Sequence, residues 1–315
     1  MDNILLIGNG FDLEHKYPTS YLEFADIVET FISLYENEVI MSSSGLSCIE
    51  KPKYDYLDWF IFSYEKYSKE FYELIKNNCW IKLFDRKYTE LAIGDNWYDL
   101  ERIVKDEVNN LNSEVMLDYD AAIEDFNKFR RAFEIYVDLF VEFARERQSR
   151  KPVSNRIANH IREINAKYIL NYNYTDTFTK LYNKDVYVDY LHGKAQFRGT
   201  IDTCNIVFGI DTITLPQRKN KYKDYTKEYQ CKKFGIETKY HQWLNGKRCN
   251  LHIYGHSLDE TDKDSLKDIL LHPSVNDIYI WEFDEVKYHS KLDALKNILP
   301  EQYNAISQRV NMKMI

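Results

Sequence analysis

Two polar residues, His192 and Asn173, each follow an apolar run of the kind that forms a buried strand. A histidine at such a strand end is expected to lie exposed in a crevice and to titrate near neutrality, which makes His192 a candidate general base. Its alternative role is a structural hydrogen bond to a neighbouring loop. The amide of Asn173 could orient a ribose hydroxyl or a water molecule, and its alternative role is to cap a helix over 175–181.

A glycine-containing turn, Gly8-Asn9-Gly10-Phe11-Asp12, follows the apolar run 4–7. Glycines at this place in an α/β protein let backbone N–H groups approach a phosphate. The third glycine of the nicotinamide-dehydrogenase fingerprint is absent, because position 13 is Leu, and the next expected strand lies too far away for a short βαβ unit. A hydride-transferring dehydrogenase is therefore not favoured, and a tight turn without a ligand remains the alternative.

A second polar turn, Gly255–Asp262, holds His256, Ser257, Asp259 and Asp262. Ser257 lacks the second glycine of the serine-hydrolase nucleophile elbow, so it is expected to cap the next helix or to touch phosphate. The spacing of the His and Asp residues matches no metal-binding motif, and we expect no metal site.

The apolar runs and the helical patterns between them predict an α/β fold with a Rossmann-like, mostly parallel sheet. Ligands of such sheets bind beyond the carboxyl ends of the strands, so the polar loops should converge on one crevice. Helical patterns, among them 98–112 and 120–148, predict a large helical insertion at 25–160, between core segments 1–24 and 161–315. The expected strands are 4–7, 166–170, 186–191, 205–208, 250–254 and 277–281.

The composition argues against several classes of protein. The chain has 315 residues, of which 44% are hydrophobic, and its net charge of -8 lacks the basic excess usual in nucleic-acid-binding proteins. It begins with no basic leader and contains no run of the ~20 apolar residues needed to span a bilayer, so we expect a cytoplasmic protein without membrane association. Five cysteines without a C-x-x-C pair argue against a disulfide framework and a zinc ribbon.

Aromatic and basic residues leave two alternatives open. The 26 tyrosines are compatible with a homo-oligomer interface, although codon bias is the favoured cause. Segment 218–239 holds eight Lys or Arg residues against three acids, interleaved with Tyr222, Tyr225 and Tyr229. This pattern could bind phosphates or single-stranded nucleic acid, but a solvated helical segment is favoured.

Several stretches, in the same order along the chain, resemble the AbiH family of bacteriophage abortive-infection proteins. The chain is also similar, at a distance, to sirtuin-like NAD-hydrolysing defence domains, which carry G-A-G-x-S, N-Y-D, H-G and G-x-S-x-x-D loops. Asp12 stands where those domains usually have Ser, and Thr175 where they usually have Asp. The stretches are LLIGNGFDLEHKYPTSYLEF at 5–24, NWYDLE at 96–101, NYNYTD at 171–176, LHG at 191–193, FGID at 208–211 and GHSLDETD at 255–262.

The resemblance implies binding of NAD or a related nucleotide as substrate, without a prosthetic group, and cleavage of the nicotinamide–ribose bond. It implies that His192 acts on a ribose hydroxyl or water and that Asn173 positions them. Zinc-dependent deacylation is not favoured, because the paired cysteines of sirtuin deacylases are missing. The expected nucleotide-binding residues are Gly8, Asn9, Gly10, Phe11, Asp12, Thr175, Asp176, Gly209, Asp211, Gly255, Ser257 and Asp262.

Three functional hypotheses follow. The leading one is an abortive-infection effector that hydrolyses NAD or a related nucleotide after sensing a phage-derived trigger. The second is a nucleotide-binding sensor without turnover, which signals through its helical insertion. The third is a nucleic-acid-acting enzyme that uses segment 218–239.

Overall fold

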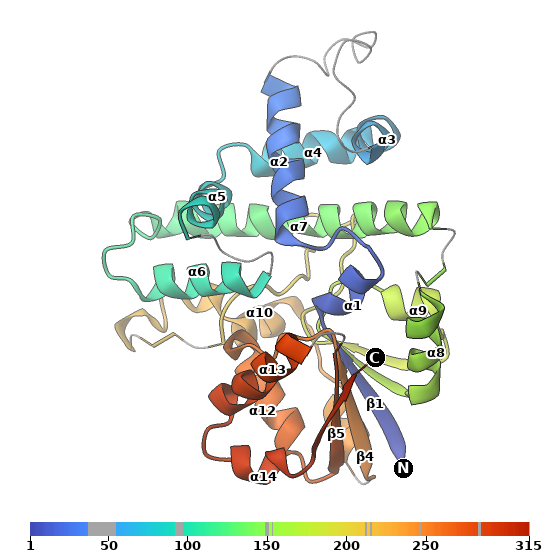
Figure 1. The fold of residues 1–315 in the computed structure, drawn as a ribbon. Coiled ribbons are helices and arrows are strands. Elements are labelled where there is room, and N and C mark those ends of the chain that lie inside the picture. The colour runs from blue at the N-terminus through green and yellow to red at the C-terminus, as the bar shows by residue number, and fades with distance from the viewer. Residues whose placement is uncertain are drawn as a thin grey trace.

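The computed structural model describes residues 1–36, 55–91, 97–148 and 151–314, except positions 153, 212, 215, 246, 283 and 284. Within these ranges six strands form one sheet in which every pairing is parallel, which confirms the predicted Rossmann-like α/β fold (Figure 1). In sheet order the strands are β3 (Tyr187–Tyr190), β2 (Tyr168–Asn171), β1 (Asp2–Ile7), β4 (Cys249–Tyr254), β5 (Val275–Glu282) and β6 (Val310–Met314).

The strand order reverses beside β1. From β1 the chain moves outward to β2 and β3, and then crosses to the other side of β1 for β4, β5 and β6. This is the strand order of doubly wound α/β folds, in which ligands bind where the order reverses. The ligand crevice is therefore expected between the loops that follow β1 and β4.

The first strand is apolar because it is buried on both faces of the sheet. Leu5 and Ile7 pack on one face and Ile4 and Leu6 on the other, as the alternation of side chains along a strand requires. The first face is covered by α1 (Asn9–Glu14), α8 (Asn155–Ile164) and α9 (Thr177–Leu181). The second is covered by α11 (Tyr240–Leu244), α12 (Lys263–Leu271), α13 (Glu285–Ile298) and α14 (Tyr303–Ser307).

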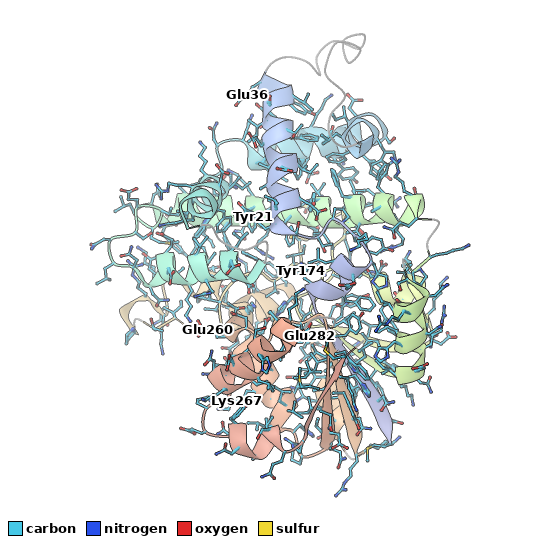
Figure 2. The ribbon with its side chains drawn as sticks, in the orientation of Figure 1. Tyr21, Glu36, Tyr174, Glu260, Lys267 and Glu282 are labelled. Atoms are coloured by element: carbon cyan, nitrogen blue, oxygen red, sulfur yellow. The ribbon has the colours of Figure 1, made fainter. Side chains whose placement is uncertain are left out.

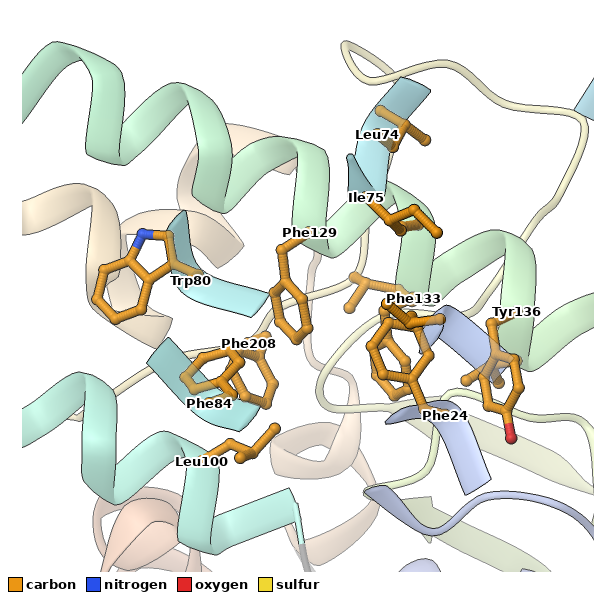
Figure 3. Close-up of a cluster of buried hydrophobic side chains, with 14 of the residues drawn as sticks. Phe24, Leu74, Ile75, Trp80, Phe84, Leu100, Phe129, Phe133, Tyr136 and Phe208 are labelled. Atoms are coloured by element: carbon orange, nitrogen blue, oxygen red, sulfur yellow. The ribbon is translucent and has the colours of Figure 1, made fainter. Parts of the chain in front are cut away.

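A helical layer lies above the carboxyl edge of the sheet, between β1 and β2 in sequence (Figure 1). Its central helix crosses over the sheet and buries the apolar stripe that contains Tyr136, Leu139 and Phe140. Phe24, Phe129, Phe133 and other aromatic rings form its core (Figure 3). The helices are α2 (Tyr21–Glu36), α3 (Asp55–Ser63), α4 (Glu65–Ile75), α5 (Cys79–Leu91), α6 (Trp97–Asn109) and the central α7 (Tyr119–Arg147).

Helices α2 and α8 (Asn155–Ile164) lie at the two ends of this helical layer in sequence. All of α2 packs with the helical core, and the apolar residues of α8 pack against the sheet. The predicted boundaries at 24/25 and 160/161 therefore fall inside α2 and α8. The segment after β3 also joins the helical core, through Ile206, Phe208 and neighbouring residues. It continues into α10 (Lys227–Phe234), and short 3-10 turns lie at Pro216–Arg218, Lys223–Tyr225 and Glu260–Asp262.

One strand prediction was wrong, and one strand was not predicted. Segment 205–208 is largely buried but forms no strand, because its backbone groups bond mostly to side chains, apart from the Val207 N–H, which donates to the His192 carbonyl. Arg130 Nε donates to the Ile206 carbonyl at 2.7 Å, and Gln230 bonds both the N–H and the carbonyl of Phe208. The last strand is not 277–281, which lies within β5, but β6, which pairs with β5 at the sheet edge.

Candidate functional site

The register of the parallel strands brings four strand ends to one level. Ile7 pairs with Asn171 and with Tyr254, and Asn171 pairs with Tyr190. Four polar side chains therefore leave the sheet at the same edge, each two positions beyond a strand end. They are Asn9, Asn173, His192 and His256.

These side chains line a cleft of about 510 Å³. Glu101 of α6 and two residues of α7 line it from the helical layer, and α13 contributes another wall. Two of the lining residues, Tyr174 in the loop after β2 and Glu282 at the end of β5, lie at the carboxyl edge of the sheet, below the helical layer (Figure 2). The predicted site residues that line the cleft are Gly8, Asn9, Gly10, Asp12, Asn173, Thr175, His192, Gly255, Ser257 and Asp262.

Two predicted residues, Phe11 and Asp176, are used in packing and ion pairs away from the cleft. Phe11 is fully buried against the sheet, where its ring packs near that of Phe178. Asp176 pairs with Arg145 and Lys194, each at 3.0 Å, and these two cations hold its pKa below the ordinary value although burial opposes ionisation. Neither residue lines the cleft.

Gly209 and Asp211 lie behind the cleft wall. Gly209 adopts φ +155° against the carbonyl oxygen of Tyr225, which a Cβ would approach to 2.2 Å. Its N–H donates to Glu101 Oε1 at 3.2 Å, so it supports a lining residue without being one. Asp211 accepts a hydrogen bond from the backbone N–H of Asp264 at 3.1 Å.

The glycines of the two turns allow a close contact between the β1 and β4 loops. A Cβ on Gly10 would lie 2.8 Å from the Cα of Gly255, and one on Gly8 would lie 2.6 Å from the Cα of His256. Gly255 also has φ +66°, in the left-handed region that favours glycine. The backbones of the two loops thus touch directly, which side chains would prevent.

The N–H groups of the first turn are already used within the protein. Gly8 N–H donates to the Tyr254 carbonyl, Gly10 N–H to the Gly255 carbonyl and Phe11 N–H to the Gly8 carbonyl. The predicted phosphate-binding turn therefore lacks these three donors, and contact between loops accounts for its glycines.

Asp262 is the centre of a buried charge network. Its Oδ1 accepts a hydrogen bond from Lys227 Nζ at 2.6 Å and lies 3.0 Å from His192 Nε2. Its Oδ2 lies 3.5 Å from His256 Nε2. Burial alone would raise the pKa of Asp262, but Lys227 and the histidines hold it well below the ordinary range. The cleft wall therefore carries a fixed carboxylate.

Lys227 connects Asp262 to the helical layer. Its ammonium group donates to Glu101 Oε2 at 3.0 Å, to the Thr261 carbonyl at 2.8 Å and to Asp262, so all three N–H donors are used. Burial opposes the charge, but the two carboxylates hold the pKa of Lys227 well above its ordinary value. Burial raises the pKa of Glu101, which shares this cation with Asp262.

The two histidines of the network are buried and neutral near pH 7. His192 is 8% exposed, so the prediction that it lies exposed was wrong. Burial, together with Lys227, lowers the pKa of His192. His256 Nδ1 accepts the N–H of Leu258 at 2.9 Å, so its Nε2 carries the proton that faces Asp262. Burial lowers the pKa of His256 to about 3.

Asn173 joins the two loops on the other side of β1. Its Nδ2 donates to the Gly8 carbonyl at 2.9 Å, and its backbone N–H donates to Asn171 Oδ1 at 2.8 Å. It does not cap a helix, because α9 begins after Asp176. The amide is therefore held in one orientation beside the cleft.

Asp12 is a buried carboxyl group with one unsatisfied oxygen. Its Oδ2 accepts a hydrogen bond from Thr175 Oγ1 at 2.6 Å, whereas its Oδ1 has no partner within the part of the chain that the structure describes. Burial raises the pKa of Asp12 to about 6, although Thr175 and the more distant Arg145 oppose the shift.

Three features of the site were not predicted: Lys227, which pairs with the lining residues Asp262 and Glu101, Glu101 itself, and α13. Lys227 appeared only as one cation of segment 218–239, and nothing in the spacing separates it from its neighbours. Glu101 lay in a quoted stretch, NWYDLE, without a role. Helix α13 lines the cleft with one face, which carries Lys287, Ser290, Lys291 and Ala294.

Segment 218–239 does not present all of its cations on one surface. Arg218 is buried and donates to the Val108 carbonyl at 2.7 Å, and Lys227 is buried in the cleft network. Lys232 and Lys233 pair with Glu228 and Asp224.

The described ranges contain neither a metal-binding cluster nor a membrane-spanning helix. No group of three or more His, Cys, Asp or Glu side chains is placed to hold a metal ion. No described helix combines the length and the apolar character needed to cross a membrane.

The fold and the cleft define the class of protein: a doubly wound α/β protein with a polar cleft where its strand order reverses. The model of the family described as "Bacteriophage abortive infection AbiH" matches residues 4–283. The chain therefore belongs to the AbiH family, as the sequence motifs predicted. No curated protein and no solved structure matches the chain.

Proposed function

We propose that this protein acts in abortive infection by binding NAD or a related nucleotide in the cleft and hydrolysing the bond between nicotinamide and ribose. The position of the cleft at the strand-order reversal supports ligand binding, and its volume suits a small molecule. The short motifs that resemble those of sirtuin-like NAD-hydrolysing domains support the choice of nucleotide.

The observation that carries the proposal is the fixed Asp262 carboxylate on the cleft wall. When the bond between ribose C1′ and the nicotinamide nitrogen breaks, its electron pair goes to the nitrogen and positive charge develops on the ribose. A carboxylate that is already ionised and held by Lys227 stabilises this charge without reorganisation. Water then attacks C1′ and loses a proton to solvent, which yields ADP-ribose and free nicotinamide.

Both predicted catalytic residues have a positioning role in this proposal. Asn173 positions the ribose through its fixed amide, and His192 positions Asp262 through the contact between Nε2 and Oδ1. The sequence-based role of His192, as a general base toward a ribose hydroxyl or water, stays a prediction that substitutions at this position can test.

Incubation of the purified protein with NAD tests the proposal directly. Chromatography coupled to mass spectrometry should detect nicotinamide and ADP-ribose in equal amounts. Asp262→Asn, checked by its melting curve, should release nicotinamide at least about 100-fold more slowly, since one charged stabiliser of the transition state is lost. Wild-type protein that leaves NAD and a mixed nucleotide pool unchanged would overturn the hydrolysis.

A second candidate function is a nucleotide sensor without turnover. It is favoured by the contacts of His256, whose Nδ1 accepts a backbone N–H and whose Nε2 faces Asp262, so neither nitrogen is free for proton transfer. Glu101 of α6 lines the cleft, so a bound ligand would touch the helical layer and could alter it. A sensor would be stabilised by ADP-ribose or NAD in a melting experiment without forming product.

A further inference from the structure

Two asparagine amides on the cleft wall are held in the same way. Asn9 Nδ2 donates to the Thr19 carbonyl at 3.0 Å, and Asn173 Nδ2 donates to the Gly8 carbonyl at 2.9 Å. Because a carbonyl accepts from each nitrogen, the orientation of both amides is settled, and each Oδ1 is the free acceptor. Asn173 bonds the residue that precedes Asn9, so the two amides are neighbours.

Both Oδ1 atoms remain available to a ligand. No described group donates to either oxygen, and neither is among the buried polar atoms that lack a partner. Both residues line the cleft. Two fixed hydrogen-bond acceptors therefore face it from the loops after β1 and β2.

The same wall offers few donors to an anion. The N–H groups of Gly8, Gly10 and Phe11 are bonded within the protein. The Asp12 carboxyl group lies in the same turn and would repel a phosphate when ionised. The diphosphate bridge of a dinucleotide is fully ionised at neutral pH and has only acceptor oxygens, whereas a sugar hydroxyl brings an O–H donor to each amide.

Cations line a different wall of the cleft, on α13. Lys287 and Lys291 face the cleft together with Ser290, from positions on one face of the helix. Lys291 lies 3.6 Å from Glu282 and donates to the His256 carbonyl. Lys287 is exposed, and no ion pair joins it to any residue that the structure describes.

We propose that the ligand lies in one direction in the cleft, with neighbouring hydroxyl groups of a ribose on Asn9 and Asn173 and its phosphates toward Lys287 and Ser290. This assigns the phosphates to side chains of α13 and not to the N–H groups of the glycine turn, which are bonded within the protein. The inference rests on the proposed nucleotide function and specifies how the nucleotide is recognised.

Calorimetry with two probes tests this orientation. ADP-ribose carries both ribose hydroxyls and phosphates, and inorganic pyrophosphate carries phosphates alone. Asn9→Ala and Asn173→Ala should each lower the affinity for ADP-ribose about three- to tenfold, the contribution of one hydrogen bond. The affinity for pyrophosphate should stay unchanged in both variants. Lys287→Ala should lower the affinity for both probes, and the loss should be larger at low salt, where charges are screened less.

Asn3→Ala is the matched control. Asn3 Nδ2 also donates to a backbone carbonyl, that of Ile164 at 2.6 Å, but at the amino end of β1 and outside the cleft. It should cost stability as the cleft variants do without changing either affinity. Pyrophosphate binding that weakens as much as ADP-ribose binding in the asparagine variants would reverse the orientation. Wild-type protein that binds ADP-ribose but releases no nicotinamide overturns hydrolysis alone, and wild-type protein that does not bind ADP-ribose overturns both proposals.

Discussion

Lys227 Nζ lies 2.6 Å from Asp262 Oδ1, and this contact joins the helical layer to the sheet through a single buried cation. Glu101 reaches the same ammonium group from α6, at 3.0 Å. Two carboxylates from different layers therefore depend on one charge. Loss of that charge should therefore destabilise the fold and disturb the cleft wall.

Lys227→Met should lower the free energy of unfolding by about 3–5 kcal/mol, because it leaves two buried carboxylates without their cation. Adding Glu101→Gln to this variant should recover part of the loss, since one of the two unpaired charges is then removed. Urea unfolding of the two single variants and the double variant measures this coupling. Strictly additive effects would contradict the shared-cation interpretation.

Asp12→Asn should stabilise the protein at neutral and alkaline pH. Burial raises the pKa of Asp12 from 3.8 to about 6, so the folded state binds the proton more tightly than the unfolded state. The resulting stability is fully present below pH 4 and is lost as the pH rises through 6, a change of about 3 kcal/mol at ~1.4 kcal/mol per pKa unit. The asparagine does not ionise and avoids this loss.

Unfolding curves of wild type and Asp12→Asn between pH 4 and pH 8 check this sign. The advantage of the variant should grow over this range. Asp185→Asn, which removes an exposed carboxylate from the turn before β3, should show no such trend. If the difference in stability between Asp12→Asn and wild type does not change with pH, burial does not raise the pKa of Asp12.

The sequence predicted which loops meet at the cleft, but it did not predict the hydrogen-bond and ion-pair partners of the residues in them. Polar residues after strands converge because parallel strands in register end together, and the residue types at 8–12, 171–176 and 255–262 were sufficient to find these loops. The contact between Lys227 and Glu101 joins residues 126 positions apart. No local pattern reports such a contact, so Lys227 looked like any other lysine of a basic segment.

The burial of particular side chains was the second feature that the sequence did not predict. His192 was expected to be exposed because it follows a strand, but α10 and the 3-10 turn at Glu260–Asp262 bring Lys227 and Asp262 against it. Similarly, the run 205–208 has strand-like composition, but Arg130 and Gln230 occupy its backbone groups. In both cases the structure depends on contacts with side chains that are distant in sequence, and the local pattern does not report such contacts.

Gly10→Ala should destabilise the protein by about 1–3 kcal/mol, the usual effect of overpacking, because its Cβ would lie 2.8 Å from the backbone of Gly255. The substitution should also weaken ADP-ribose binding, since it forces the β1 and β4 loops apart. Gly199→Ala is the control, because its Cβ would meet the Thr203 hydroxyl at 3.0 Å and no backbone atom closer than 3.3 Å. Reduced nucleotide affinity with an unchanged melting temperature would instead support direct contact between Gly10 and phosphate.

Substitution of His192 separates a positioning role from a proton-transfer role. His192→Ala should lower the free energy of unfolding by about 1–3 kcal/mol, because it removes a buried donor to Asp262. It should also reduce nicotinamide release. His192→Gln retains an N–H donor near the place of Nε2 but cannot act as a base at neutral pH. If His192 acts by positioning Asp262, the glutamine variant should keep turnover within about tenfold of wild type.

If His192 instead takes a proton from water or a ribose hydroxyl, both variants should lose about 10²–10⁴-fold in turnover. Melting curves and nicotinamide release from the same preparations distinguish these outcomes, because a purely structural defect lowers activity only in proportion to the folded fraction. We expect the first outcome, since burial lowers the pKa of His192 and its Nε2 already faces Asp262 at 3.0 Å. An inactive but fully folded glutamine variant would restore the general-base assignment that the sequence suggested.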